Sequence, residues 1–243
     1  MNLLPSTAPA WCAAVRHGTA HVDDRDLFVL PPFPAIPAVA RSLAGSAIRW
    51  GGQDVHAADG GAHTGDVAAP MLADLGCTIA EVGHSERRRD HGETDAVVGG
   101  KVLAALRWGL TPLMCVGERD PGPVVAAVGL VIAQLEGCVG ALGPADLGRL
   151  VVAYEPVWAI GEGAHVAPLV HVEALHRAIR GWLDEHDATD ARVLYGGSVD
   201  LENAPGLLAT PAVDGLFVGR SALDPAVFVG IATLPLPRQK EAA

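Results

Sequence analysis

The chain has 243 residues, 50% of them hydrophobic, and carries a formal net charge of −11. This length and apolar content suit one large α/β domain. The negative charge argues against nucleic acid and anionic membrane surfaces as partners. It leaves room for a small anionic substrate, because backbone amides at helix N-termini can create a local positive site in an acidic protein.

Signals for targeting and for disulfides are lacking in the sequence. No apolar run reaches the roughly 18 residues that a membrane span requires, and the opening Met1-Asn-Leu-Leu-Pro5 does not resemble a signal peptide. We therefore expect a cytoplasmic protein that does not contact membranes. Four cysteines have neither metal-ligand spacing nor the density of a disulfide scaffold, as expected in a reducing compartment.

Helical and apolar segments alternate along the chain. The first expected element is a helix over Ala10–His17, with Thr7 as its N-cap and Pro9 in its first turn. The apolar runs expected to form strands lie at 27–33, 47–54, 77–82, 112–116, 151–154, 192–195 and 213–218. Further helices are expected at 35–43, 69–75, 95–108, 124–139, 168–186 and 201–208, with a last helix after Ser221. This alternation predicts a parallel sheet.

The spacing of the strands favours a closed barrel. From the strand at Leu27 to the strand at Val213 the repeat averages about 31 residues, which suits a strand–helix unit. A (β/α)₈ barrel has eight strands, and the sequence offers seven. An eighth strand, placed one unit before Leu27, would begin ahead of Met1. We therefore predict one (β/α)₈ TIM-barrel domain over residues 1–243 that lacks its first strand in the chain as given.

Two strand ends carry candidate catalytic side chains. The strand at 151–154 delivers Glu155 ahead of Pro156, and Gly161 and Gly163 then bracket a mobile lid. The strand at 77–82 delivers His84 to the start of the next helix, which disfavours the imidazolium and keeps the ring neutral. Taken singly, each is more simply a surface histidine or a salt-bridged acid. Together, a base and a proton-donating imidazole at one sheet edge favour proton abstraction next to a carbonyl.

Glycines after the last two strands suggest a phosphate site. Gly196-Gly-Ser198 and Gly219 lie where barrels commonly bind phosphate through backbone amides. Ser198 adds a hydroxyl, and Gly161 on the lid would close from the other side. Ordinary tight turns are the alternative interpretation. Arg220 either adds positive charge at the phosphate or is a solvated residue at the start of a helix.

The acidic and basic run at 86–89 has two interpretations. Its residues are most simply a salt-bridge cluster. Alternatively, Glu86 holds a neighbouring cation of the active site.

These segments resemble the signature segments of the triosephosphate isomerase family. The resemblance rests on Gly83-His-Ser-Glu-Arg-Arg88, Tyr154-Glu-Pro-Val-Trp-Ala-Ile-Gly161 and Tyr195-Gly-Gly-Ser-Val199, in the family's order and spacing, and it covers about Leu27 to Leu223. Gly61-Ala-His-Thr-Gly-Asp66 is similar to the family's dimer loop.

The resemblance implies a homodimer without metal or organic cofactor that interconverts an aldose phosphate and a ketose phosphate through an enediol, as in glycolysis and gluconeogenesis. It implies that Glu155 is the base and His84 the electrophile. It implies further that Gly161, Ser198 and Gly219 bind the phosphate, and that Thr64 reaches into the partner's active site. The substrate implied is a triose phosphate, dihydroxyacetone phosphate or glyceraldehyde 3-phosphate.

Three departures from the family pattern matter. The family's first strand carries Asn-x-Lys-Met-Asn, and Met1-Asn2 resembles only the end of it, so the lysine that neutralises substrate charge is absent. The lid reads Gly161-Glu-Gly-Ala164 in place of Gly-Thr-Gly-Lys, and Gly219-Arg220 replaces a Gly-Gly pair. The last two resemble the branch of the family that isomerises tetrulose phosphates such as L-erythrulose 1-phosphate.

A start codon assigned too far downstream is our explanation of the absent strand. On that expectation the strands at 27–33 and 213–218 have unpaired edges, the chain melts early or aggregates, and added upstream codons restore solubility. Equal melting of both forms would contradict it. A different class of function also stays open, a non-catalytic barrel that binds sugar phosphates. A base and a proton shuttle favour the enzyme, because a binding protein needs neither.

Overall fold

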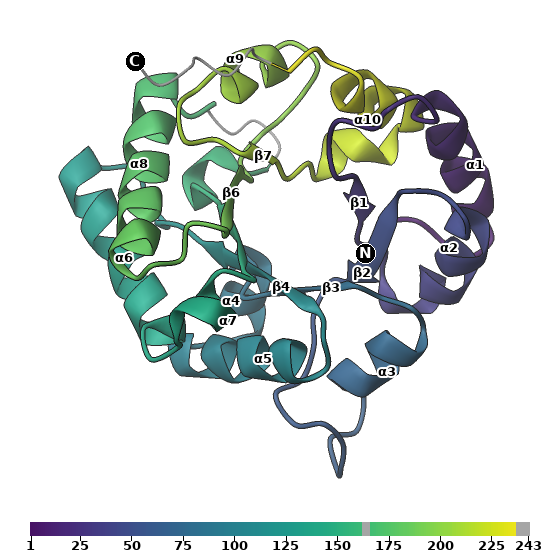
Figure 1. Cartoon of the computed structure of the whole chain (residues 1–243), viewed down its shortest axis with the longest axis horizontal. Helices are drawn as coiled ribbons and strands as arrows, with labels where there is room; N and C mark the ends of the chain where they lie inside the picture. The colour runs from purple at the N-terminus through teal and green to yellow at the C-terminus, as the bar shows by residue number, and fades with distance from the viewer. Residues whose placement is uncertain (162–165, 237–243) are drawn as a thin grey trace.

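The computed structural model describes residues 1–161 and 166–236. Its strands form one parallel sheet in which each strand pairs with its neighbour in the sequence, in the order β1 to β7. Figure 1 shows the sheet curled into a ring with the helices outside it. The strands are β1 (Phe28–Val29), β2 (Arg49–Gly52), β3 (Ile79–Val82), β4 (Thr111–Val116), β5 (Val151–Tyr154), β6 (Arg192–Tyr195) and β7 (Gly215–Leu216). The predicted barrel of parallel strands is confirmed.

The helices connect and cover these strands as the alternation predicts. The α-helices are α1 (Ala8–Gly18), α2 (Ile36–Leu43), α3 (Ala69–Asp74), α4 (Ser85–His91), α5 (Asp95–Arg107), α6 (Val124–Val139), α7 (Pro144–Leu147), α8 (Leu169–Glu185), α9 (Ala204–Leu208) and α10 (Pro225–Ala232). Short 3₁₀ helices are η1 (Phe33–Ala35), η2 (Val157–Ala159) and η3 (Arg220–Leu223). None of the described helices is long and apolar enough to cross a membrane.

Several predicted boundaries were wrong for local reasons. The strand expected at 27–33 is only Phe28–Val29, because Pro31 and Pro32 have no backbone N–H to donate. Thr7 precedes α1, but its hydroxyl donates to the Leu4 carbonyl at 3.1 Å and does not cap the helix. Residues 201–203, expected to be helical, form a turn in which the Asp200 carboxylate accepts two backbone N–H groups.

The first and last strands are joined through their helices. Among the described residues, β1 pairs only with β2, and β7 only with β6. Beside them α1 packs against α10, where Trp11 meets Phe228 edge to face with ring centroids 5.4 Å apart. The Trp11 indole also donates to the Ala222 carbonyl of η3 at 3.0 Å. The rings of Phe28 in β1 and Phe217 after β7 stack at 6.3 Å.

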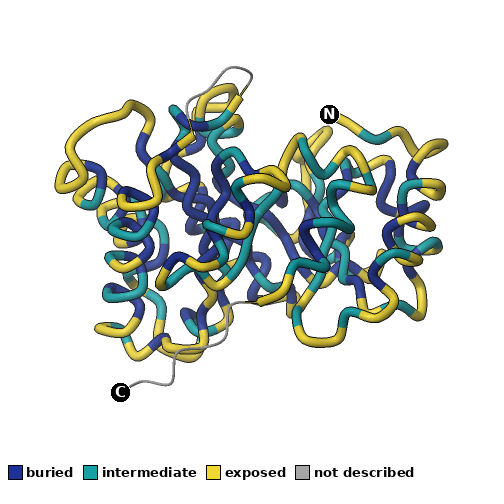
Figure 2. Tube along the Cα trace, turned by 90° about the horizontal axis from the view of Figure 1, so that it is seen from above, coloured by how far each residue is buried: buried dark blue, intermediate teal, exposed yellow. Residues whose placement is uncertain are grey.

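Apolar side chains fill both faces of the sheet. A large core lies between the sheet and the helices, and a smaller cluster belongs to the barrel interior. Figure 2 shows buried positions concentrated inside the molecule and exposed positions mainly at its periphery. The interior cluster comprises Ile79, Leu113, Cys115, Ala153 and Leu194, with Phe28, Leu30, Val151 and Phe217 against it. This interior cluster lies inside the barrel beneath the loops that follow the strands.

Candidate active site

His84 and Glu155 meet above the carboxyl ends of β3 and β5. The imidazole Nε2 of His84 lies 3.2 Å from Glu155 Oε1, although the two residues are 71 positions apart in the sequence. Glu155 is only 3% exposed. Its second oxygen accepts the backbone N–H of Ser85 at 3.3 Å, at the start of α4. The structure thus brings together the two side chains that the sequence singled out.

The His84 ring is oriented by the helix that follows it. Its Nδ1 accepts the backbone N–H of Glu86 at 3.2 Å, which fixes the N-terminus of α4 and requires an unprotonated Nδ1. The ring then carries its proton on Nε2, facing Glu155. Burial disfavours the imidazolium, but the hydrogen bond and charge of Glu155 prevail and raise the pKa of His84 to about 9. The contact with Glu155 therefore favours the imidazolium, against the neutral ring that we expected, whereas the hydrogen bond from the Glu86 N–H favours the neutral ring.

A glycine lets the strand that delivers Glu155 lie close to its neighbour. A Cβ on Gly117, just after β4, would lie 1.8 Å from the Glu155 carbonyl oxygen. The amide group of Gln134 in α6 holds Gly117 from the other side, accepting its N–H at 2.8 Å and donating to its carbonyl at 3.1 Å. The backbone position of Glu155 is therefore fixed by close packing.

A buried polar network holds the turn that follows Glu155. The Glu118 carboxylate, 2% exposed, accepts the Trp158 indole N–H at 2.7 Å and the Tyr154 hydroxyl at 3.0 Å. The Nε2 of His171 in α8 lies 3.0 Å from the same carboxylate. Trp158 belongs to η2, so this network ties η2 to the loop after β4. Glu118 and His171 were not predicted from the sequence, although an acid two residues after an apolar strand was a usable signal.

The predicted phosphate residues lie after three strands: Gly161 beyond η2, Ser198 after β6, and Gly219 with Arg220 after β7. Ser198 binds the Ala159 carbonyl twice, through its hydroxyl at 2.7 Å and its backbone N–H at 3.2 Å. Both donors of Ser198 are therefore engaged with η2. Gly161 is exposed, with φ of +118°, a conformation that favours glycine. The expected lid residues from Glu162 to Ala164, including Gly163, lie outside the described residues.

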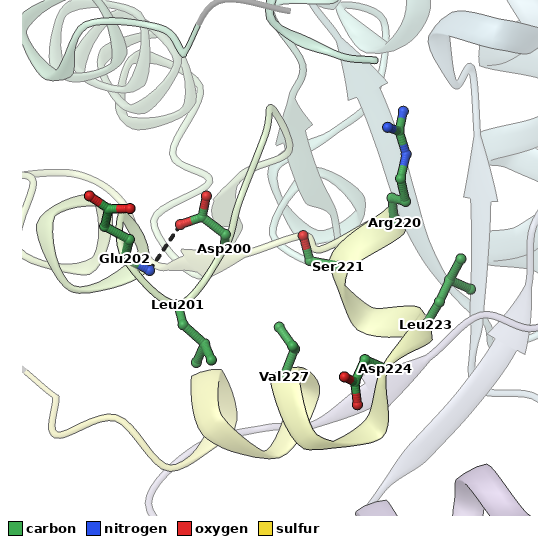
Figure 3. A pocket seen from close by; sticks show the side chains of 8 residues that line it. All are labelled: Asp200, Leu201, Glu202, Arg220, Ser221, Leu223, Asp224 and Val227. Carbon is green, nitrogen blue, oxygen red and sulfur yellow. Dashed lines mark hydrogen bonds between the residues drawn. The ribbon is translucent and has the colours of Figure 1, made fainter. Parts of the chain in front are cut away.

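Arg220 borders a cleft on the surface of the barrel. A cleft of about 550 Å³ lies between the loop after β6 and the segment η3–α10. Figure 3 shows Leu201 and Val227 on its walls and Arg220 extending from the start of η3. Of the predicted site residues only Arg220 lines this cleft, which is separate from the residues around Glu155. The hollow at Glu155 measures about 20 Å³, which is room for about one water molecule.

The run after His84 forms the salt-bridge cluster expected from the sequence, with acidic partners that lie outside the run. Arg87 pairs with Asp54 and Glu93, and Arg88 pairs with Asp95 at 2.6 Å. Arg89 pairs with its neighbour Asp90. Glu86 is exposed, and its carboxylate lies 3.9 Å from the Nδ1 of His84.

The predicted dimer loop projects from the barrel between β2 and α3. All residues of the segment 61–66 are exposed, Thr64 included, and Figure 1 shows the loop extending away from the ring. Within the described residues, three potential metal ligands cluster at its base, with atoms within 4.8 Å of one another: His56, His63 and Asp66. The Nδ1 of His56 accepts the backbone N–H of Ala58 at 3.0 Å.

A curled parallel sheet with a carboxylate and an imidazole at its carboxyl edge defines a (β/α)-barrel enzyme. Comparisons with known proteins identify the family of barrel enzymes to which the chain belongs. The sequence model of the family described as "Triosephosphate isomerase" matches residues 1–234, and the chain belongs to that family. The chain is similar to the triosephosphate isomerase of Thermus thermophilus, at 44% identity over 95% of this chain and 94% of that protein.

Other relatives agree. The triosephosphate isomerase of Bordetella pertussis is 49% identical over 85% of this chain and 83% of that protein. The crystal structure of triosephosphate isomerase from Bartonella henselae superposes with a TM-score of 0.83 at 32% identity, covering 95% of this chain and 93% of that one. The family predicted from the motifs is confirmed.

Proposed function

We propose that this protein is a triose-phosphate isomerase that interconverts dihydroxyacetone phosphate and glyceraldehyde 3-phosphate. The observation that carries the proposal is the contact of His84 with Glu155 at the carboxyl edge of the barrel. Family membership supports the same reaction, since the relatives above bear that name.

The reaction needs a base next to the carbon that carries the proton and a proton donor next to the carbonyl oxygen. In our proposal the Glu155 carboxylate removes a proton from the carbon next to the carbonyl, and His84 Nε2–H donates to the carbonyl oxygen. An enediol forms. The deprotonated Nε2 of His84 then removes the proton of the hydroxyl on the other carbon, and the Glu155 carboxylic acid, whose proton can exchange with solvent, protonates the former carbonyl carbon. No net redox change or cofactor is required, because a ketose phosphate and an aldose phosphate are isomers.

Substrate binding changes the charge balance of the pair. The hollow at Glu155 is too small for a sugar phosphate, so the substrate has to part His84 from Glu155. Parting them removes the contact that raises the His84 pKa, whereas burial and the Glu86 N–H still favour the neutral ring. The imidazole then acts as a neutral donor. Ser85 N–H has to release Glu155 for the carboxylate to reach carbon.

The phosphate is assigned to the loops at Gly161, Ser198 and Gly219, with Arg220 adding charge. Ser198 can donate to phosphate only after it leaves the Ala159 carbonyl. We infer that binding exchanges these two bonds for bonds to phosphate, which couples occupancy of the site to the position of η2. Backbone N–H groups provide the rest of the anion site.

The assembly and setting are parts of the same proposal. We infer a homodimer in which Thr64 on the exposed loop reaches the partner's active site, with Glu86 supporting His84. We infer a cytoplasmic enzyme of glycolysis and gluconeogenesis that binds neither nucleic acid nor membranes, in keeping with the net charge of −11.

The test is turnover of glyceraldehyde 3-phosphate by the chain and by Glu155→Gln. Because general base catalysis contributes about 10²–10⁴-fold, we expect kcat to fall by at least that factor in the variant. Glu173→Gln is the matched control, since it removes an acid from an exposed surface pair with Arg177 and should leave kcat unchanged. Equal turnover by Glu155→Gln and the wild type would contradict the assignment.

A tetrulose phosphate is the second candidate substrate. Arg220 favours it, because this large side chain stands at the cleft where the family pattern has glycine. Comparing kcat/KM for L-erythrulose 1-phosphate and glyceraldehyde 3-phosphate decides between the two. Higher kcat/KM for the tetrulose, reversed in Arg220→Gly, would establish the second candidate.

A further inference from the structure

A buried histidine at the start of α8 contacts the residues behind the proposed base. His171 is the third residue of α8 and is 7% exposed. Its Nε2 lies 3.0 Å from Glu118 Oε1 and 3.0 Å from the Tyr154 hydroxyl oxygen. Its ring also meets the Trp158 indole edge to face, with ring centroids 5.5 Å apart. The proposed mechanism assigns no step to this side chain.

These contacts require a hydrogen on the Nε2 of His171. An ionised carboxylate can only accept hydrogen bonds, so a ring nitrogen 3.0 Å from Glu118 Oε1 has to donate. Burial and the neighbouring Glu118 raise the pKa of Tyr154, so its hydroxyl keeps its proton and donates to the carboxylate oxygens at 3.0 and 3.1 Å. The Trp158 indole N–H is the third donor, at 2.7 Å. Three donors therefore converge on one buried acceptor.

The three donors come from segments on both sides of the proposed base. Tyr154 ends β5 directly before Glu155, and Trp158 lies within η2 just after it. His171 belongs to α8, the next helix of the described chain. The Glu118 carboxylate therefore binds the residues that precede and follow the base, and His171 extends this attachment to α8.

We propose that His171 is a positioning residue of the isomerisation, which holds the Glu118 carboxylate through its Nε2–H and thereby fixes η2 behind Glu155. This inference rests on the proposed function. A buried carboxylate that loses a donor turns towards its other partners or draws in water. The bond from the Trp158 indole then weakens, and the turn after the base loses its fixed position. His171 acts through Glu118 and touches no reacting atom.

Two variants separate the hydrogen bond from the bulk of the side chain. His171→Gln offers an amide N–H in place of Nε2–H, whereas His171→Leu keeps apolar volume and has no donor. With both sugar phosphates, we expect kcat to fall about fivefold or more in His171→Leu and to stay within about twofold of the wild type in His171→Gln. His171→Met also has no N–H and replaces the leucine variant should that one fail to fold.

His17→Leu is the control, because it makes the same change at an exposed histidine of α1 and should leave kcat unchanged. Equal kcat for the wild type and His171→Leu would overturn the proposal. An equally low kcat for His171→Gln and His171→Leu would also overturn it, because the N–H would then not be what matters.

A double-mutant cycle with Trp158→Phe tests the route through Glu118. If His171 acts by holding the acceptor of the indole, adding His171→Leu to a protein that already lacks the indole N–H should change kcat by less than about twofold. Independent effects would instead multiply in the double variant. That result would overturn the proposal, because His171 would then influence turnover apart from the Trp158 bond.

A second readout separates this proposal from the proposed function. The indole N–H resonance of Trp158, assigned with Trp158→Phe, is followed by NMR while the protein exchanges into D₂O. We expect exchange at least about tenfold faster in His171→Leu than in the wild type, and near the wild-type rate in His171→Gln. If the wild type turns over neither sugar, the proposed function and the role of His171 in turnover are both overturned, and the exchange rate still shows whether His171 holds the Trp158 bond. Turnover with unchanged exchange in His171→Leu overturns only the His171 proposal.

Discussion

The indole of Trp158 donates to the buried Glu118 carboxylate at 2.7 Å, and this bond ties η2 to the loop after β4 directly behind Glu155. Through the Glu118 carboxylate, this hydrogen bond connects the segments that follow β4 and β5. The turn that follows the proposed base is therefore held by a side-chain network in addition to backbone geometry.

Trp158→Phe should mainly affect kcat rather than the free energy of unfolding. The variant keeps most of the apolar contact but removes a hydrogen bond to a charged group, which contributes about 1.5–3 kcal/mol. We expect a drop in kcat of about tenfold or more, because η2 and Glu155 lose their fixed position. Steady-state kinetics measure it. Trp108→Phe, at the exposed end of α5, is the control, and equal kcat for both variants would show that the Glu118 bond is dispensable.

Gly117→Ala tests the close approach of the strands. A methyl group there would overlap the Glu155 carbonyl, so the two strand ends have to separate. We expect a loss of about 1–3 kcal/mol in the free energy of unfolding, together with reduced kcat. Urea unfolding and kinetics measure both. Gly122→Ala provides the matched control, because nothing lies within 4 Å of its added methyl.

His176 should make the fold sensitive to mild acid. It is fully buried, its Nδ1–H donates to the Ala212 carbonyl at 3.1 Å, and its Nε2 has no hydrogen-bond partner in the described part of the chain. Burial lowers its pKa from 6.5 to about 4. Below pH 6.5 this histidine is protonated in the unfolded chain but stays neutral in the folded chain. The contribution of His176 to the free energy of unfolding is therefore unaffected above pH 6.5 and decreases as the pH falls towards 4.

His176→Phe isolates this effect. The loss attributable to His176 amounts to about 3 kcal/mol over the whole window. Urea unfolding of both proteins at pH 7 and pH 5 measures it, and the variant should lose less stability than the wild type between these two values. The same loss in both proteins would mean that other groups cause the acid sensitivity.

The proposed role of the exposed loop at 61–66 leads us to expect a homodimer in solution. If Thr64 enters a partner's active site, the chain should elute with twice its 25.0 kDa mass in size-exclusion chromatography with light scattering. Shortening the loop by removing residues 60–65 should give a monomer with lower kcat. A monomeric wild type with full activity would contradict the homodimer.

Sequence alone predicted the barrel and the placement of Glu155 and His84 at one of its edges, because both depend on local order. Apolar runs alternate with helical segments, and parallel strands place Glu155 and His84 on one edge. A helix was expected to start after His84, but the extent of α4 was not predicted, because Ser85–His91 contains no apolar residue to give periodicity.

Contacts between distant segments could not be predicted. The two bonds from Ser198 to Ala159 and the network around Glu118 join residues from different strand-to-helix loops. Their partners are set by the way β4, β5 and β6 are placed side by side, and no local pattern encodes that.

The most direct test of the central claim follows the proton itself. Dihydroxyacetone phosphate is incubated with the protein in D₂O, and deuterium at the carbon next to the carbonyl is measured by proton NMR. We predict incorporation at that carbon by the wild type, and a rate at least about 10²-fold lower with Glu155→Gln. Equal incorporation by both proteins would contradict the assignment of Glu155 as the base.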